Sequence, residues 1–148
     1  MSGLHLCQTS YDNDIEGVKA ILRKKRVNVN YRDESEWTPL MNAAYAGAPQ
    51  VVELLLKRED IDVNASDNSG TTALMNAALC GDARVVKLLL KRTDIEVKAK
   101  DNSGKTALDF AKERGVDEVI KRIKAAQSVS GQAKKLAKRI SSRFSLAR

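Results

Sequence analysis

The feature that most constrains this chain is an internal repeat with an offset of 34 residues. A seven-residue stretch that begins Thr-Pro-Leu at 38–44 returns as Thr-Ala-Leu at 72–78, and in weaker form at 106–112. A second stretch, Val-Val-x-Leu-Leu-Leu-Lys-Arg at 51–58, returns at 85–92. A unit this short cannot bury its apolar face alone, so successive units must stack on one another. The sequence therefore predicts an all-α repeat solenoid.

The period divides the chain into about four units and a tail. The units are predicted at 3–35, 36–69, 70–103 and 104–126, which together form a repeat domain over 1–126. A linker is predicted at 127–131, and a basic amphipathic helix or tail at 132–148.

The first and last units are expected to be caps, because a terminal unit needs a polar outer face. Arg122 and Lys124 would supply that face in the last unit, and Gln8, Thr9 and Ser10 in the first.

Turn and capping residues recur in the same register as the apolar stretches. A threonine precedes the predicted first helix of units two to four, where its hydroxyl can accept a hydrogen bond from the first turn. A glycine follows the same three helices, where a left-handed residue can end each of them. These positions are Thr38, Thr72 and Thr106, then Gly47, Gly81 and Gly115. Asp14 and Asp82 are expected to cap second helices, and Pro49 to begin one.

The stretches 38–44 and 72–78 resemble the signature of the ankyrin repeat, Thr-Pro-Leu-His-x-Ala-Ala. The resemblance covers about 120 of the 148 residues. Met41 and Met75 stand where the family usually has histidine, and Asn42 and Asn76 replace a common apolar residue. The resemblance implies units of two helices plus a β-hairpin or loop.

The charge of +7 is unevenly placed along the chain. Residues 1–120 carry 17 Lys/Arg and 19 Asp/Glu, whereas residues 121–148 carry nine Lys/Arg and no acidic residue. The basic balance therefore belongs to the tail and gives no reason to expect nucleic-acid binding by the repeats.

Residues suited to catalysis are sparse. The chain has one histidine, His5, and no Cys/His cluster with metal-ligand spacing. Cys7 and Cys80 fall in units one and three, too far apart for a disulfide. We therefore expect no enzymatic activity, no cofactor and no metal. The first ten residues lack the pattern of a secretion signal, which favours a cytoplasmic protein. The run at 23–26, Arg-Lys-Lys-Arg, allows nuclear import or a solvated helix end.

Binding to a protein is the function that the resemblance implies, through the loop tips and the exposed side of the first helices. The implied partner-binding positions are Arg32, Glu34, Trp37, Asn42, Tyr45, Asn68, Thr71, Asn76, Leu79, Lys105 and Glu113. Trp37 is the single tryptophan, and it either contacts a partner or packs over the neighbouring hairpin. Asn42 and Asn76 form either a recognition strip or a hydrogen-bonded ladder within the stack. We expect a monomer that inhibits or scaffolds its partner.

The tail supports an alternative function. Ala133, Leu136, Ala137, Ile140 and Phe144 fall on one narrow apolar stripe at helical spacing, and basic residues cover the rest. Such helices dock on anionic membranes or acidic partners, although this one could also pack on unit four or fray. The predicted tail-binding positions are Lys134, Lys135, Leu136, Lys138, Arg139, Ile140, Arg143 and Phe144. The run 138–141, Lys-Arg-Ile-Ser, resembles a basophilic kinase target, which makes Ser141 a candidate phosphorylation site.

Overall fold

The computed structural model describes residues 1–146, with side chains omitted at 130, 134 and 144–146. This part of the chain forms eight helices and no strand longer than an isolated bridge. Their bounds are α1 Ser2–Tyr11, α2 Ile15–Leu22, α3 Pro39–Ala46, α4 Pro49–Leu56, α5 Ala73–Cys80, α6 Ala83–Leu90, α7 Ala107–Arg114 and α8 Asp117–Leu146. The predicted all-α repeat solenoid is confirmed.

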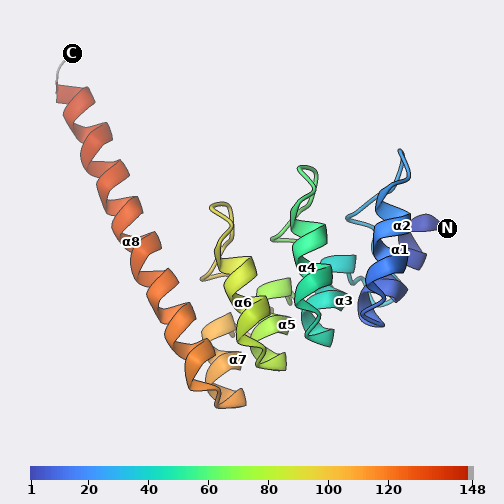
Figure 1. Ribbon diagram of the computed structural model, residues 1–148. Helices are drawn as coiled ribbons and strands as arrows, with labels where there is room; N and C mark the ends of the chain where they lie inside the picture. The colour runs from blue at the N-terminus through green and yellow to red at the C-terminus, as the bar shows by residue number, and fades with distance from the viewer. Residues whose placement is uncertain (147–148) are drawn as a thin grey trace.

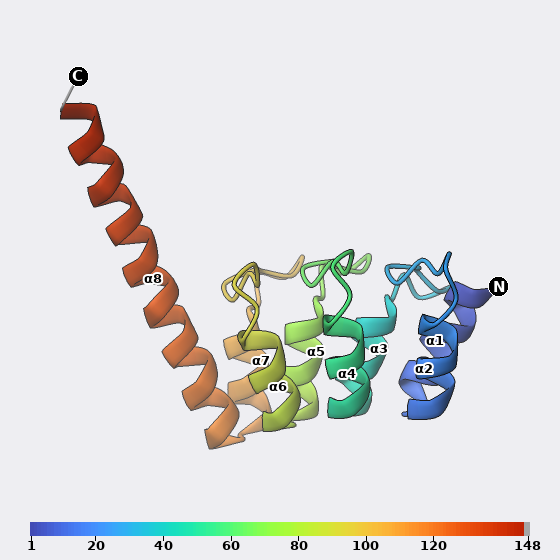
Figure 2. The same ribbon diagram turned by 45° about the horizontal axis from the view of Figure 1, so that its top comes forward.

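The helices stack in two layers (Figures 1 and 2). The first helices of the four units, α1, α3, α5 and α7, contact one another in sequence and form one layer. The second helices, α2, α4 and α6, form the other layer, which the beginning of α8 completes. Between units, the loops project together from one edge of the stack (Figure 2). The core lies between the layers, where Leu40, Leu55, Leu74 and Leu89 are at most 1% exposed.

The capping residues behave as their positions predict. The hydroxyls of Thr38 and Thr72 accept hydrogen bonds from the backbone N–H groups of Met41 and Met75. Thr106 does the same in a reciprocal capping box with Asp109.

The ends of the first helices follow the prediction as well. They stop at Gly47, Gly81 and Gly115, whose φ angles are 65°, 78° and 78°. Because a side chain is disfavoured at these angles, glycine sets where α3, α5 and α7 end, whereas α1 stops at Asp12, before Asn13 with φ at 55°.

The methionines at the usual histidine position belong to the core. Met41 and Met75 are 0% and 1% exposed. A thioether needs no hydrogen-bond partner when it is buried, so methionine fills this position with apolar volume instead of a polar contact. The departure from the family pattern therefore leaves the packing of units two and three intact.

The expected cap of unit one is only partly correct. Gln8 is exposed, but Thr9 and Ser10 are 6% and 0% exposed. They lie one repeat before Ala43 and Ala44, at positions where the first helices pack closely and only small side chains fit. The Thr9 hydroxyl donates to the backbone oxygens of His5 and Leu6, so it is satisfied without water.

The predicted linker at 127–131 is wrong in conformation, since α8 runs through it without a break. Serine and glycine weaken a helix, with glycine costing about 1 kcal/mol relative to alanine, but neither ends one. No proline lies in this segment, and Gly131 is not among the glycines with positive φ. The strong helix formers on both sides therefore carry one helix from unit four into the tail.

Candidate functional site

Three large apolar side chains are exposed one repeat apart on the first helices. Tyr11 on α1, Tyr45 on α3 and Leu79 on α5 are 49%, 42% and 41% exposed. Glu113 on α7 occupies the fourth position and is also exposed. We call these four residues the first-helix row. Single exposed apolar residues are ordinary, but three in register on adjacent helices make a patch suited to a partner.

The first, second and third loop tips, residues 33–37, 67–71 and 101–105, are each held by the same hydrogen bonds to an aspartate. In the second tip, Asp67 Oδ1 accepts from the backbone N–H groups of Ser69 and Thr71, at 2.9 Å each. Asp33 and Asp101 make the same pair of bonds in the first and third tips. Short polar side chains that bond the backbone two and four residues on stabilise tight turns. The three tips therefore share one hydrogen-bonded turn conformation.

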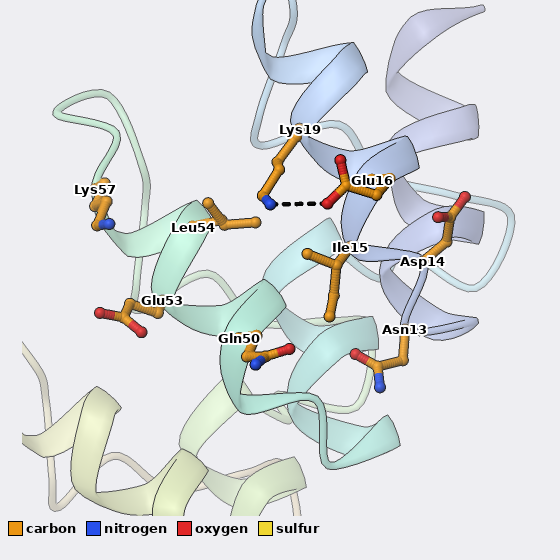
Figure 3. Close-up of a pocket in the computed structure, with 9 residues that line it drawn as sticks. All are labelled: Asn13, Asp14, Ile15, Glu16, Lys19, Gln50, Glu53, Leu54 and Lys57. Atoms are coloured by element: carbon orange, nitrogen blue, oxygen red, sulfur yellow. Dashed lines mark hydrogen bonds and ion pairs between the residues drawn. The ribbon is translucent and has the colours of Figure 1, made fainter.

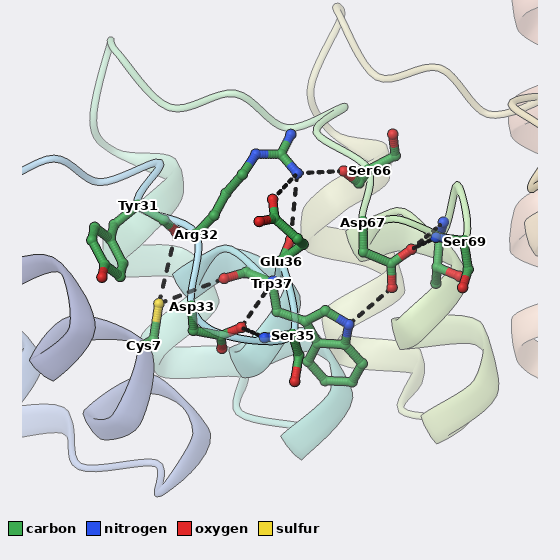
Figure 4. A network of polar contacts seen from close by, with 11 residues as sticks. Cys7, Tyr31, Arg32, Asp33, Ser35, Glu36, Trp37, Ser66, Asp67 and Ser69 are labelled. Carbon is green, nitrogen blue, oxygen red and sulfur yellow. Dashed lines mark hydrogen bonds and ion pairs between the residues drawn. The ribbon is translucent and has the colours of Figure 1, made fainter.

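Trp37 joins two tips (Figure 4) and packs against a member of the first-helix row. Its indole Nε1 donates to Asp67 Oδ2 at 2.9 Å, across to the next tip. Its ring packs edge-on against Tyr45, with centroids 5.2 Å apart and planes at 62°. The packing alternative therefore accounts for the half-buried indole. Contact with a partner stays a prediction for its remaining exposed surface.

Arg32 makes a second bridge between neighbouring tips (Figure 4). Its Nη1 donates to the backbone oxygen of Ser66 at 2.6 Å, and lies 3.6 Å from Glu36 Oε2. Its side chain is 42% exposed, so the guanidinium still reaches solvent. Glu34, at the same tip, is exposed.

Asn42 and Asn76 are not on the surface. They are 6% and 2% exposed, and both use their side-chain amides internally. Asn42 Nδ2 donates to Asp33 Oδ2 and to the backbone oxygen of Thr38, while Asn76 Nδ2 reaches the backbone oxygen of Met41 at 3.5 Å. The ladder alternative explains these two residues, and burial removes them from the surface that a partner could meet.

The remaining predicted positions lie at the second and third tips and on α7. Asn68 is exposed, and its backbone oxygen accepts from Asn102 Nδ2 at 2.8 Å; Thr71 is half-buried. Lys105 Nζ lies 2.7 Å from Glu113 Oε1 and 5.6 Å from the Phe110 ring centroid. The hydrogen bond to Glu113 raises the pKa of Lys105. The first-helix row is thus apolar in units one to three and charged in unit four.

Among the hollows on the repeats, two lie beside helices of the first two units. One, of about 210 Å³, lies between α1 and the first tip. It includes Leu4, Tyr11 and Glu34. Leu4 is 49% exposed and was missed by the sequence analysis, although its place seven residues before Tyr11 puts both on one helix face.

The other hollow, of about 530 Å³, lies between α2 and α4 on the opposite layer (Figure 3). It includes Ile15, Leu54 and the ion pair of Lys19 with Glu16, whose atoms are 2.8 Å apart. The sequence gives no signal for it, because its shape depends on the spacing between helices.

The Cys7 thiol is held in an unreactive setting. Cys7 is 3% exposed, and its Sγ lies 3.8 Å from the backbone oxygen of Tyr31. Burial, with a smaller contribution from the charge of Asp33, raises the pKa of Cys7 to about 12. Because the thiolate is the nucleophile, this thiol is poorly suited to covalent chemistry. Within residues 1–146, no His, Cys, Asp and Glu side chains gather as a metal site. None of the described helices is both long and apolar enough to cross a membrane.

The predicted tail positions lie toward the C-terminal end of α8, which extends away from the repeats (Figures 1 and 2). We call residues 128–143 the free part of α8. Leu136 and Ile140 are 59% and 49% exposed, and Val129 is 64% exposed. The other described tail positions, Lys135, Lys138, Arg139, Ser141 and Arg143, are exposed too. The side chains of Lys134 and Phe144 lie outside the described residues.

Comparison with known proteins assigns most of the repeat region to one family. The family model for ankyrin repeats, in three copies, matches residues 4–101. No curated protein matches the chain.

Proposed function

The chain belongs to the ankyrin-repeat family, and from this premise we propose that it binds a protein partner through the first-helix row and the loop tips. Ankyrin repeats are generally protein–protein interaction modules. In this proposal the repeats act as an inhibitor or a scaffold and not as an enzyme, and the chain works as a monomer in the cytoplasm or nucleus.

The observation that carries the proposal is the exposure of Tyr11, Tyr45 and Leu79 in register. Aromatic side chains contribute most where a partner excludes water from them. Tyr45 is also supported from behind by Trp37, so it would lose little freedom on binding. The ordered tips beside the row add polar contacts that could fix the orientation of the partner.

The test is affinity capture from cell lysate with quantitative mass spectrometry, using the full chain and two double variants. Tyr45→Ser with Leu79→Ser removes two members of the row. Glu53→Ser with Lys87→Ser changes two exposed positions on α4 and α6, in the opposite layer, and serves as the matched control. The proposal expects a partner that the control retains and the row variant loses. Equal retention by both variants would refute it.

We also propose a second function, for the free part of α8. Its exposed apolar and basic residues support docking on an anionic membrane or an acidic partner, with the repeats holding cargo. Electrostatic docking of this kind weakens steeply as salt rises, whereas a Tyr/Leu-centred contact does not. Salt dependence of the captured partners therefore separates the two functions.

Phosphorylation of Ser141 would regulate that second function. Ser141 is exposed and follows Lys138 and Arg139. A phosphate would add about two negative charges and so lower the net positive charge of the tail by about two. A kinase assay on the full chain, with Ser141→Ala as the comparison, tests whether this serine is modified.

A further inference from the structure

Three large apolar side chains on residues 128–143 of α8, here called the stripe, are left uncovered by the part of the chain that the structure describes; Ala137, which the sequence pattern also placed on this face, lies at its edge and is not counted in it. Val129, Leu136 and Ile140 are 64%, 59% and 49% exposed, at spacings of two turns and one turn. A free helix gains little stability from its own backbone in water, so an amphipathic one usually owes its helical form to a surface that covers its apolar side. We therefore expect the stripe to bind a surface that covers it.

The repeats of the same chain are not that surface, because the stripe faces another direction. The side of α8 that packs on α6 and α7 carries Val119 and Ile123, both 0% exposed. About five turns later, the same side carries Ala137 and Ser141.

The stripe continues a different side of the helix. Leu136 and Ile140 lie about five turns beyond Glu118 and Arg122. Those two residues form an ion pair of 2.8 Å whose side chains are 53% and 36% exposed. The stripe thus extends the more exposed side of α8 and does not face the described repeats, so its partner is sought outside them.

The charge around the stripe indicates the chemistry of that partner. Residues 121–148 hold nine Lys/Arg and no acidic residue. Arg139 and Arg143 border the stripe on one side by helical spacing, and both are exposed. A second copy of this helix is therefore repelled, and a surface with dense negative charge is attracted.

We propose that the free part of α8 lies flat on a lipid bilayer containing anionic lipids, with Val129, Leu136 and Ile140 below the headgroups. This inference rests on the tail-docking function proposed above and commits it to one partner. A bilayer uses both halves of the helix, since lipid takes up the apolar stripe and its headgroups neutralise the flanking cations.

Other occupants use less of what the helix offers. A protein groove accepts helix anchors at the same spacings of four and seven residues, so the apolar side chains alone fit either partner and the choice of a bilayer rests on the nine Lys/Arg in residues 121–148. Nucleic acid would leave the stripe in water.

The test is cosedimentation of the full chain with vesicles of phosphatidylcholine, alone or mixed with phosphatidylserine. Binding is expected to the mixed vesicles and not to neutral ones, and to be lost at high salt. Leu136→Ser with Ile140→Ser should weaken binding about tenfold or more, since each loses an inserted side chain. Lys135→Gln with Lys138→Gln should weaken binding through lost charge alone, and its binding should depend less steeply on salt than that of the natural chain over the range where both still bind.

Two controls make the result specific. Tyr45→Ser with Leu79→Ser, on the repeats, should bind vesicles like the natural chain, so failure of the first proposed function cannot imitate failure of this one. Leu136→Trp should show a blue shift of emission only with anionic vesicles, because insertion and not charge attraction alone moves the indole out of water.

Each result decides between the proposals. Absence of vesicle binding, or equal binding to neutral and anionic vesicles, would overturn the lipid assignment. If binding to vesicles fails while the stripe variant loses an acidic protein in the lysate capture, tail docking survives with a protein partner. If the stripe variant changes neither vesicle binding nor capture, tail docking fails as well.

Discussion

At the scale of single residues, the first tip differs from the others in one backbone position. Gly70 and Gly104 end the second and third tips with φ angles of 76° and 79°, but the equivalent residue in the first tip is Glu36, with φ at 61°. A side chain in this left-handed region costs about 1–3 kcal/mol. Part of that cost is offset by the ion pair of Glu36 with Arg32, which is exposed and therefore weak.

Glu36→Gly is expected to stabilise the chain by about 0.5–1 kcal/mol, because glycine adopts this angle without a clash. Urea unfolding at equilibrium measures the change. Glu34→Gly, two residues away at an exposed position, is the control and should be neutral or destabilising. Destabilisation by Glu36→Gly would mean that the ion pair outweighs the backbone cost.

Gly70→Ala is expected to destabilise more than Gly104→Ala, although the two angles are nearly the same. A Cβ at Gly70 would lie 2.9 Å from Asn102 Oδ1 and 3.0 Å from its backbone nitrogen, whereas nothing lies within 4 Å at Gly104. Both variants carry the left-handed cost of roughly 1–2 kcal/mol, and only the first disturbs the neighbouring tip. Equal unfolding midpoints for the two variants would show that the tips do not touch as described.

Asp109 is expected to make stability fall in acid. Hydrogen bonds from the backbone N–H and then the hydroxyl of Thr106 lower the pKa of Asp109 below its ordinary 3.8. A carboxyl whose folded pKa is lowered stabilises the fold above its unfolded pKa, and this stabilisation is lost as pH falls below about 4. Asp109→Asn should therefore lose less stability than the natural chain across that window. Carboxyl NMR titration checks the pKa directly, and a midpoint at or above 3.8 would contradict it.

At the scale of elements, neighbouring loops are joined by side-chain amides. Asn30 accepts from the backbone N–H of Asp62 at 2.8 Å and donates to the backbone oxygen of Asp60 at 2.7 Å. Asn64 makes the same pair with Glu96 and Asp94, one repeat later. An amide has both a donor and an acceptor, so one side chain satisfies two backbone groups of the next loop. The third equivalent residue is Lys98, and no fourth loop follows it.

Asn64→Ala is expected to destabilise the repeats by about 1–2 kcal/mol, through the loss of two hydrogen bonds. Lys98→Ala, at the equivalent exposed position, should change stability by less than about 0.5 kcal/mol. Thermal unfolding followed by circular dichroism compares them. Similar effects for the two variants would mean that the amide bridges contribute nothing beyond the loop itself.

The sequence predicts elements with local signals and misses those set by neighbouring units. The threonine caps and glycine ends are local, and the structure confirms them. Thr9 and Ser10 look polar in isolation, but the packing of α1 on α3 buries them. The segment 127–131 looks like a linker because serine and glycine are weak helix formers, yet nothing in it ends a helix.

The candidate site shows the same division. Repeat spacing alone aligns Tyr11, Tyr45 and Leu79, which the structure leaves exposed. It cannot show that the Trp37 indole is used by Asp67 in the next tip, because that bond joins two units. The burial of Asn42 likewise depends on how the first tip closes over α3, through Asp33.

At the scale of the whole molecule, the repeats and the free tail differ in what stabilises them. Every described residue of α8 from 128 to 143 except Gly131 is exposed, whereas its beginning is part of the core. In a stacked array, stability comes from each unit and its neighbours, so a segment that touches no unit adds nothing to it.

Ile123→Ala is therefore expected to cost about 2–4 kcal/mol, because Ile123 is 0% exposed at the contact of α8 with the repeats. Leu136→Ala, on the same helix, should shift stability by no more than about 0.5 kcal/mol. Denaturant unfolding of both variants makes the comparison. A large cost for Leu136→Ala would show that the tail packs on the repeats in solution.

Because α8 continues without a break through residues 127–131, it also fixes the direction in which the stripe faces relative to the repeats. An α-helix turns about 100° per residue, so the number of residues between Ile123 and Ile140 sets the angle, around the helix axis, between the side of α8 that packs on the repeats and the stripe. Inserting one alanine into this stretch would swing the repeats about a quarter turn around the helix axis without altering a single contact within them. Inserting seven alanines would nearly restore the original angle and move the repeats about 10 Å along the helix axis. Whatever surface the stripe meets, the length of this segment decides which side of the solenoid is presented to the rest of the cell.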